Sequence, residues 1–134
     1  MSLSSSAALS PVQMLRVSAF AVLLWISGAV LIRLTIPLGV FSGGVLTVLA
    51  YAIGIAINVP TIWLARLLGG LRQDQIIFGM ALGSGVAILC DGLALTWAPG
   101  LYGGVSEDLH RAAAWLLWTV AFGLIGAFIV ERRG

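Results

Sequence analysis

The longest stretch of this chain without a charged side chain runs from Leu34 to Ala65. About 20 mostly apolar residues are enough for a helix to cross the hydrocarbon core of a bilayer. Only 9% of the residues are charged, whereas a soluble domain carries about a quarter. Further uncharged runs are Val17–Ile32, Gln75–Cys90 and Ala112–Val130. The sequence therefore predicts an all-α integral membrane protein, a single four-helix bundle domain over residues 1–134.

Capping and turn residues predict the ends of the spans. Ser10, followed three residues later by Gln13, forms a capping-box pattern at the start of the first helix. Asp74 and Ser106 are predicted N-caps of the third and fourth spans. Pro60 is expected to bend the last turn of the second span. The predicted spans are residues 11–36, 41–63, 74–97 and 107–131, after a disordered N-terminal tail of residues 1–9.

The arginines predict the orientation of the bundle. All seven basic residues are arginine, and with four spans the two termini and the loop between spans two and three share one side of the membrane. Basic residues favour the cytoplasmic side, so we expect both termini in the cytoplasm and a multi-pass protein of the plasma membrane. The side with the termini carries Arg16, Arg66, Arg72, Arg132 and Arg133, against Arg33 and Arg111 on the other.

Composition excludes several classes of function. A formal net charge of +2 over short loops is too small for a surface that binds nucleic acid. The one cysteine, Cys90, lies inside a span and cannot build a disulfide framework. His110 follows Glu107 and Asp108 at a helix start, where acidic residues are favoured by the helix dipole. We therefore expect no metal, no cofactor and no catalysis, and the lipid bilayer is the expected surrounding.

Small residues on two spans predict close helix packing. The third span carries Gly79, Gly83 and Ala87, and the second span carries Ala50 and Gly54, at helical spacings of three and four. Contacts within one chain are the first interpretation of these faces. The alternative is an interface with a membrane-protein partner or with a second copy.

Asp91 is a carboxylate in the outer part of the third span. An acid inside the membrane costs at least ~2.5 kcal/mol and indicates a functional site by default. Ser84 and Ala87 lie two turns and one turn earlier on the same face, so we expect Asp91 to point into the bundle. Arg33, at the outer end of the first span, is the predicted ion-pair partner. Other candidate hydrogen-bond partners of Asp91 are His110 and Tyr102.

Asn58, close to Pro60, is the second polar feature inside a span. An amide beside a helix break could line a cavity, or it could form a hydrogen bond between helices. We expect Asn58 in the inner half of the membrane and Asp91 in the outer half. The two residues are therefore predicted to be too far apart along the membrane normal to form one compact site.

Two segments, Asp91–Gly103 (DGLALTWAPGLYG) and Arg111–Trp118 (RAAAWLLW), resemble a family of small bacterial four-span membrane proteins of unknown function. The resemblance covers mainly the C-terminal half. It implies a one-domain protein of a bacterial inner membrane and carries no activity with it.

Small multidrug transporters are similar in size but have an essential glutamate in the middle of their first span. Val17–Ile32 contains no acid, so that family is set aside.

The first functional hypothesis is an accessory or structural subunit, or a homo-oligomer, that acts through helix packing without catalysis. The alternative is a small solute or proton-linked transporter that uses Asp91, and a membrane enzyme that uses Asp91 and His110 comes third. A water-accessible cavity that reaches Asp91 would favour transport. A dry Asp91 bonded to Arg33 or to backbone would favour a structural lock, and an exposed Gly79 and Gly83 face would favour a partner protein.

Overall fold

The computed structural model describes residues 7–134, which form helices and loops without a strand. Four helical segments are long and apolar enough to cross a membrane: Pro11–Leu38, Val45–Gly69, Gln73–Trp97 and Glu107–Arg133. The predicted all-α fold with four candidate spans is therefore confirmed. The elements are α1 (Pro11–Thr35), η1 (Ile36–Leu38), α2 (Val45–Ala56), α3 (Asn58–Gly69), η2 (Gln73–Gln75), α4 (Ile76–Trp97), η3 (Pro99–Tyr102) and α5 (Glu107–Arg133).

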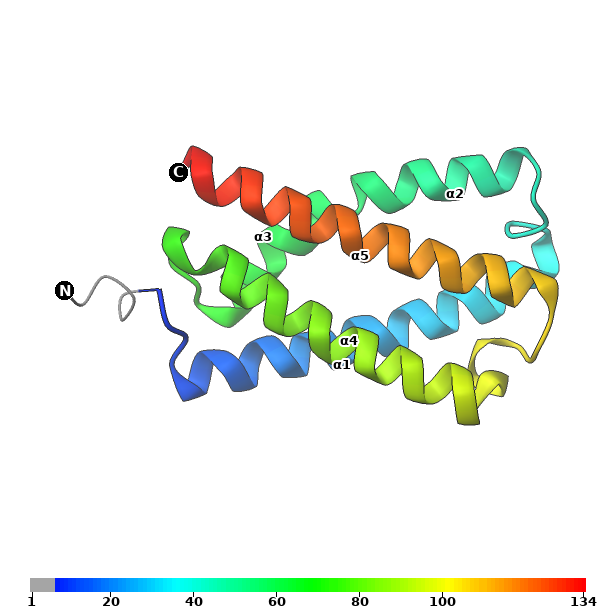
Figure 1. The fold of residues 1–134 in the computed structure, drawn as a ribbon, viewed down its shortest axis with the longest axis horizontal. Helices are drawn as coiled ribbons and strands as arrows, with labels where there is room; N and C mark the ends of the chain where they lie inside the picture. The colour runs from blue at the N-terminus through cyan, green and yellow to red at the C-terminus, as the bar shows by residue number, and fades with distance from the viewer. Residues whose placement is uncertain (1–6) are drawn as a thin grey trace.

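The helices run along the longest axis of the molecule, and the beginning of α1 lies at the same end as the end of α5 (Figure 1). Helices α1, α4 and α5 extend over the full length, and α2 and α3 follow one another along the fourth side. Helix α3 packs against α1, α4 and α5, whereas α2 packs mainly against α5. The bundle is thus closed on all sides around α3 and is more open between α1 and α2.

The outer surface of the spans is apolar. Leu23, Val48, Ile53 and Leu117 are between 58% and 69% exposed, although each is a large hydrophobic residue in the middle of a helix. In water such a surface would be an aggregation hazard, but lipid tails are as apolar as these side chains. The surface and the four candidate spans are compatible with a multi-pass membrane protein.

Local sequence signals predicted two of the helix starts correctly. The Ser10 hydroxyl accepts from the Gln13 N–H at 3.1 Å, and the Gln13 side chain accepts from the Ser10 N–H at 2.9 Å. The Ser106 hydroxyl accepts from the Leu109 N–H at 3.1 Å at the start of α5. Both predicted N-caps are confirmed, and with them the starts of the first and fourth spans.

The predicted N-cap at Asp74 is wrong. The Asp74 carboxylate instead forms an ion pair with Arg72 at 3.1 Å within the loop before α4. The N–H of Ile77, in the first turn of α4, donates to Glu131 at 3.1 Å, from the last turn of α5. The cap is supplied from another helix because the end of α5 lies beside the start of α4.

The predicted bounds of the second span, 41–63, are also wrong, because the span begins at Val45 with α2 and ends at Gly69 with α3. The start is later because Gly43 has a φ of +94° and belongs to a loop. Thr47 holds that loop, since its hydroxyl accepts from the Gly43 N–H at 2.9 Å. Helix α3 then continues past Pro60 to Gly69.

The break in the second span falls in its middle and not in its last turn. Helix α2 ends at Ala56 and α3 begins at Asn58. Pro60 has no N–H to donate to the carbonyl four residues earlier, and its ring clashes with that carbonyl, which belongs to Ala56. The irregular backbone therefore lies one turn before the proline, halfway between the two ends of the bundle.

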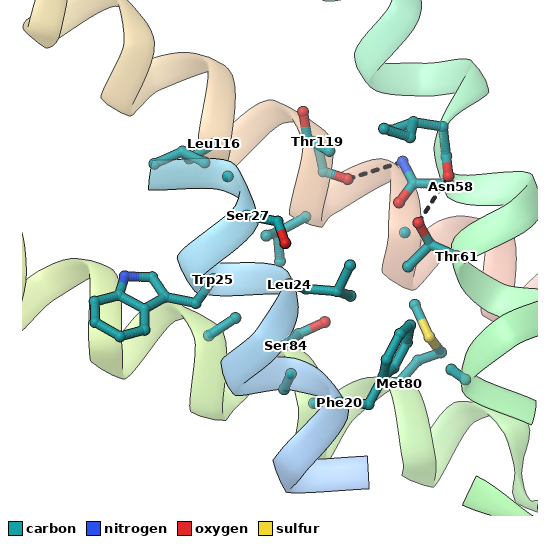
Figure 2. Close-up of a pocket in the computed structure, with 18 of the residues that line it drawn as sticks. Phe20, Leu24, Trp25, Ser27, Asn58, Thr61, Met80, Ser84, Leu116 and Thr119 are labelled. Atoms are coloured by element: carbon teal, nitrogen blue, oxygen red, sulfur yellow. Dashed lines mark hydrogen bonds between the residues drawn. The ribbon is translucent and has the colours of Figure 1, made fainter. Parts of the chain in front are cut away.

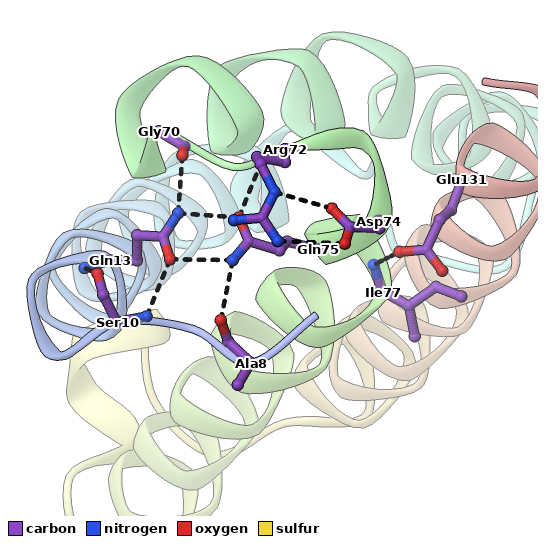
Figure 3. Close-up of polar contacts among 9 residues, drawn as sticks. All are labelled: Ala8, Ser10, Gln13, Gly70, Arg72, Asp74, Gln75, Ile77 and Glu131. Carbon is purple, nitrogen blue, oxygen red and sulfur yellow. Dashed lines mark hydrogen bonds and ion pairs between the residues drawn. The ribbon is translucent and has the colours of Figure 1, made fainter. Parts of the chain in front are cut away.

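A polar network joins the helix ends on the side of the termini (Figure 3). Gln75 is 1% exposed and exchanges hydrogen bonds with Gln13 at 2.9 and 3.2 Å. Gln75 also donates to the Ala8 carbonyl at 2.9 Å, and Gln13 donates to the Gly70 carbonyl at 2.8 Å. Of the predicted disordered tail, residues 1–6 lie outside the described residues, whereas Ala8 is held by this bond.

The buried apolar residues form two clusters, one towards each end of the bundle. One gathers around Tyr102, Trp115 and Ile32, and the other around Ile76, Met80 and Ile62. The two clusters share no residue, and a cavity between them is lined by apolar side chains with a few polar ones. The candidate site lies in this middle region.

Candidate functional site

Asp91 lies on α4 and is half-buried, and it accepts a hydrogen bond from the Tyr102 hydroxyl through its Oδ1 atom. The same hydroxyl accepts a hydrogen bond from the indole Nε1 of Trp25, on α1, at 2.9 Å. Three elements, α1, α4 and η3, thus meet at one phenol oxygen. The second carboxylate oxygen, Oδ2, accepts no hydrogen bond within residues 7–134.

The predicted ion pair between Asp91 and Arg33 is not formed. The Arg33 guanidinium donates to the Gly100 carbonyl at 3.4 Å and is exposed at the end of the bundle. Drawing a guanidinium into the bundle would remove its hydration, and one ion pair compensates that loss poorly. The Tyr102 hydroxyl reaches Asp91 without such a penalty because a phenol carries no charge.

The turn after α4 places Tyr102 inside the bundle. Pro99 begins η3, and Gly103, with a φ of +105°, ends it in the left-handed region that favours glycine. The turn directs Tyr102 back under α4, where it is 0% exposed. Burial, and then the hydrogen bond to Asp91, raise the pKa of Tyr102 well above its usual range. The phenol therefore remains a proton donor at every physiological pH.

His110, the other predicted hydrogen-bond candidate, is exposed on the first turn of α5 and does not bond to Asp91. Its neighbour Asp108 pairs with Arg111 at 3.3 Å. Within the described chain no three His, Cys, Asp or Glu side chains gather in a way that could hold a metal ion. The structure does not bring Asp91 and His110 together as an acid–base pair.

A cavity of about 240 Å³ occupies the middle of the bundle between α1, α3, α4 and α5. Figure 2 shows the side chains around it, with Phe20, Leu24 and Met80 among the apolar ones. Asp91 is its only ionisable lining residue. Its main polar lining residues are Trp25, Ser27, Asn58, Thr61, Ser84 and Thr119.

Asn58 bridges the helix break to α5. Its Nδ2 donates to the Gly54 carbonyl at 2.9 Å and to the Thr119 carbonyl at 3.0 Å, and the residue is buried. Both amide hydrogens are thus used by the backbone of α2 and α5. This is the predicted hydrogen bond between helices, and Asn58 lines the cavity at the same time.

The sequence predicts that Asn58 and Asp91 are too far apart along the membrane normal to form one compact site, and that stays a prediction. Both residues nevertheless line this one cavity. Ser84 and Ala87 lie on α4 between Met80 and Asp91 and are too small to fill the space towards α1 and α5. A void therefore extends along the bundle and connects the helix break to the carboxylate.

The small residues predicted as packing faces lie inside the chain. Gly83 faces α1, since a Cβ there would lie 3.4 Å from Val17, whereas Ala87 lines the cavity. Gly79 is buried against Leu71. These predicted glycines are therefore occupied within the chain, whereas Gly85 and Gly92 on α4 are exposed with open space at their Cβ positions.

On α2 the small residues face α5. The Ala50 carbonyl accepts from Trp115 Nε1 at 2.7 Å. A Cβ at Gly54 would lie 2.7 Å from the Thr119 hydroxyl, so only glycine allows this approach of α2 to α5.

A second cavity, of about 160 Å³, lies between α4 and α5 and shares Asp91, Leu116 and Val120 with the first. Apolar residues such as Leu95, Ala113 and Leu117 line it. Asp91 is thus the ionisable residue that lines both spaces within the described chain.

Trp25 is a member of the site that was not identified from the sequence. A buried indole N–H needs a hydrogen-bond acceptor, and the middle of an apolar span offers none in its own helix. That requirement was the signal in the sequence that could have identified Trp25.

The chain matches no protein-family model, no curated protein and no solved structure. The resemblance to a bacterial four-span family stays a prediction.

Proposed function

We propose that this protein is a small membrane carrier that binds a solute in the central cavity and uses Asp91 as its proton-binding group. The observation that carries this proposal is the cavity of about 240 Å³ that reaches Asp91 in the middle of four candidate spans. Ligand sites in helical membrane proteins lie near the bilayer midplane, at discontinuous helices. The break between α2 and α3, next to Asn58, is such a discontinuity.

The surroundings of Asp91 support a role in coupling. Its hydrogen-bond partner is the neutral Tyr102, and the cavity contains no basic side chain. An ionised carboxylate without a cation is costly inside a membrane, so a proton or a positively charged solute would stabilise this site. Exchange of one for the other would couple the movement of a solute to that of a proton.

The accessory or oligomeric function stays a hypothesis with less support. It was motivated by the glycine faces, and Gly79, Gly83 and Gly54 are occupied by contacts within the chain.

For the carrier we propose that the end with both termini faces the cytoplasm, since the arginines of that end outnumber those of the other.

The test uses the full chain in phosphatidylcholine vesicles that contain a pH-sensitive dye. An imposed pH gradient is followed after addition of amines, carboxylic acids, neutral aromatic molecules or sugars, each with about ten non-hydrogen atoms. We expect at least one class to move protons in vesicles with the wild-type protein but not in those with Asp91→Asn. Asparagine keeps an oxygen that can accept from Tyr102.

Asp74→Asn is the matched control, since Asp74 lies in an exposed loop outside the cavity. It should behave like the wild type. The proposal is overturned if no class moves protons in a protein-dependent way, or if Asp91→Asn and the wild type move them equally.

A further inference from the structure

We infer that the ligand of the central cavity is an organic cation with an apolar body, and that it enters from the lipid between α1 and the junction of α2 and α3. This inference rests on the proposed carrier function and names its class of solute. It follows from the charge of the cavity, from the hydrogen bonds already made in it, and from the place where it opens.

Charge decides the class of ligand. Asp91 is the only ionisable side chain that lines the cavity, and its Oδ2 atom has no hydrogen-bond partner in the described chain. An ammonium group would pair with that oxygen by a charge-assisted hydrogen bond. An anion would meet a like charge on the ionised carboxylate, and a neutral solute would leave that half-buried charge uncompensated.

Most other polar groups of the cavity are already paired with the protein. The Asn58 amide donates to two carbonyls, the Thr61 hydroxyl donates to Ile57 at 2.8 Å, and the Ser27 hydroxyl donates to Leu23 at 2.8 Å. The hydroxyls of Ser84 and Thr119 form no hydrogen bond within the described residues, and that of Thr119 is buried. The remaining lining is mostly apolar, so the part of the ligand that extends from Asp91 towards Asn58 should be mainly apolar, with at most one or two polar atoms.

Aromatic and aliphatic side chains fit such a body. Phe20, Trp25 and Trp115 line the cavity together with Leu24 and Met80. Aromatic faces also attract cations. A cavity of about 150 Å³ is known to hold benzene, so the volume here suits about ten non-hydrogen atoms.

The opening of the cavity lies on the side of the bundle. Residues that line the cavity and are also exposed mark this opening. They are Leu24, Ser27 and Leu31 on α1 and Ile57 at the helix junction, and the three apolar ones are 37%, 46% and 40% exposed. All four lie well inside candidate spans. The opening therefore faces hydrocarbon, consistent with the sparse packing between α1 and α2. A lipid-soluble amine could reach the cavity from there in its neutral form.

Two probes of equal size test whether the cavity prefers a positively charged ligand. 3-Phenylpropylamine and butylbenzene have the same number of non-hydrogen atoms and differ only in an ammonium group against a methyl group. Binding to the full chain in lipid nanodiscs is measured by calorimetry, with empty nanodiscs subtracted. We expect the amine to bind at least about tenfold more tightly than butylbenzene to the wild type, and equally weakly to Asp91→Asn.

A pair of glycine substitutions tests the entrance. Gly28 lines the cavity, and a Cβ there would meet no atom within 4 Å, so Gly28→Phe can fill the opening without a clash at its first atom. Gly85→Phe is the matched control, since Gly85 also has free space at its Cβ but does not line the cavity. We expect Gly28→Phe to abolish amine binding and Gly85→Phe to leave it unchanged.

Equal affinity of the wild type for both probes would overturn the cationic class and leave the carrier function standing. Unchanged amine binding by Gly28→Phe would overturn the entrance between α1 and the helix junction. If neither probe binds while another solute class moves protons in the vesicle assay, only this inference fails. If both assays are negative, the carrier function fails as well. The wild-type comparison needs no variant, so it holds even if Asp91→Asn does not fold.

Discussion

Replacing Tyr102 with phenylalanine removes one oxygen atom and keeps the buried ring. That oxygen donates to Asp91 and accepts from Trp25 at 2.9 Å, so two hydrogen bonds between different elements disappear together. The ring stays 0% exposed in its cluster, and its apolar contribution is unchanged. The substitution therefore isolates the hydrogen bonds that connect α1, η3 and α4.

The expected loss follows from the number of bonds. A hydrogen bond between helices in a membrane protein contributes ~0.6 kcal/mol on average and ~1.7 kcal/mol at most. With two bonds lost, we expect Tyr102→Phe to lower the free energy of unfolding by about 1–3 kcal/mol. The Trp25 N–H and the Asp91 Oδ1 atom both lose their partner, which places the value in the upper part of this range.

Tyr51→Phe is the matched control. The Tyr51 ring packs on Trp118 with 5.2 Å between ring centroids, and its hydroxyl makes no hydrogen bond in the described structure. Unfolding is followed by circular dichroism as sodium dodecyl sulfate is added to the protein in mild detergent. We expect a change within about 0.5 kcal/mol for Tyr51→Phe. A Tyr102→Phe loss no larger than that of the control would refute the hydrogen-bond network.

The same unfolding assay checks four further predictions. Gly54→Ala should cost about 1–3 kcal/mol because its methyl group meets the α5 side chains, whereas Gly28→Ala, with open space at its Cβ, should be neutral or stabilising. Gln75→Leu should cost about 1–3 kcal/mol, since it removes the hydrogen bonds of the buried Gln75 side chain to Gln13, Arg72 and Ala8. Arg33→Ala should change stability by less than about 0.5 kcal/mol, and a larger loss would indicate that Arg33 does stabilise Asp91. Because the pKa of Tyr102 is raised in the folded state, the contribution of Tyr102 to the free energy of unfolding should be full below pH ~10 and should decline as the pH rises further. A free energy of unfolding that stays constant above pH ~10 would contradict the burial of Tyr102.

Much of the framework was determined by the sequence. Four candidate spans were predictable because the free energy of an uncharged helix in a membrane depends mainly on its own residues. The N-caps at Ser10 and Ser106 were predictable because each bond closes within three residues. The inward direction of Asp91 was predictable because Ser84 and Ala87 share its helical face, and all three line the cavity.

Other features of the site were decided by the tertiary structure. Tyr102 lies eleven residues after Asp91 and reaches it only because η3 turns the chain back into the bundle. Glu131 caps α4 because the end of α5 lies beside it. Such bonds depend on which helix ends meet, and no periodic pattern within one helix encodes that.

The cavity itself could not be predicted from the sequence. Ser84 and Ala87 are small residues of α4, and they line a void between α1, α3, α4 and α5 instead of a close contact. Whether small side chains bring two helices together or leave a space depends on the angle at which the neighbouring helix passes. The sequence therefore determined the spans and the carboxylate, and the packing of α1, α3 and α5 around α4 decided that a cavity reaches Asp91.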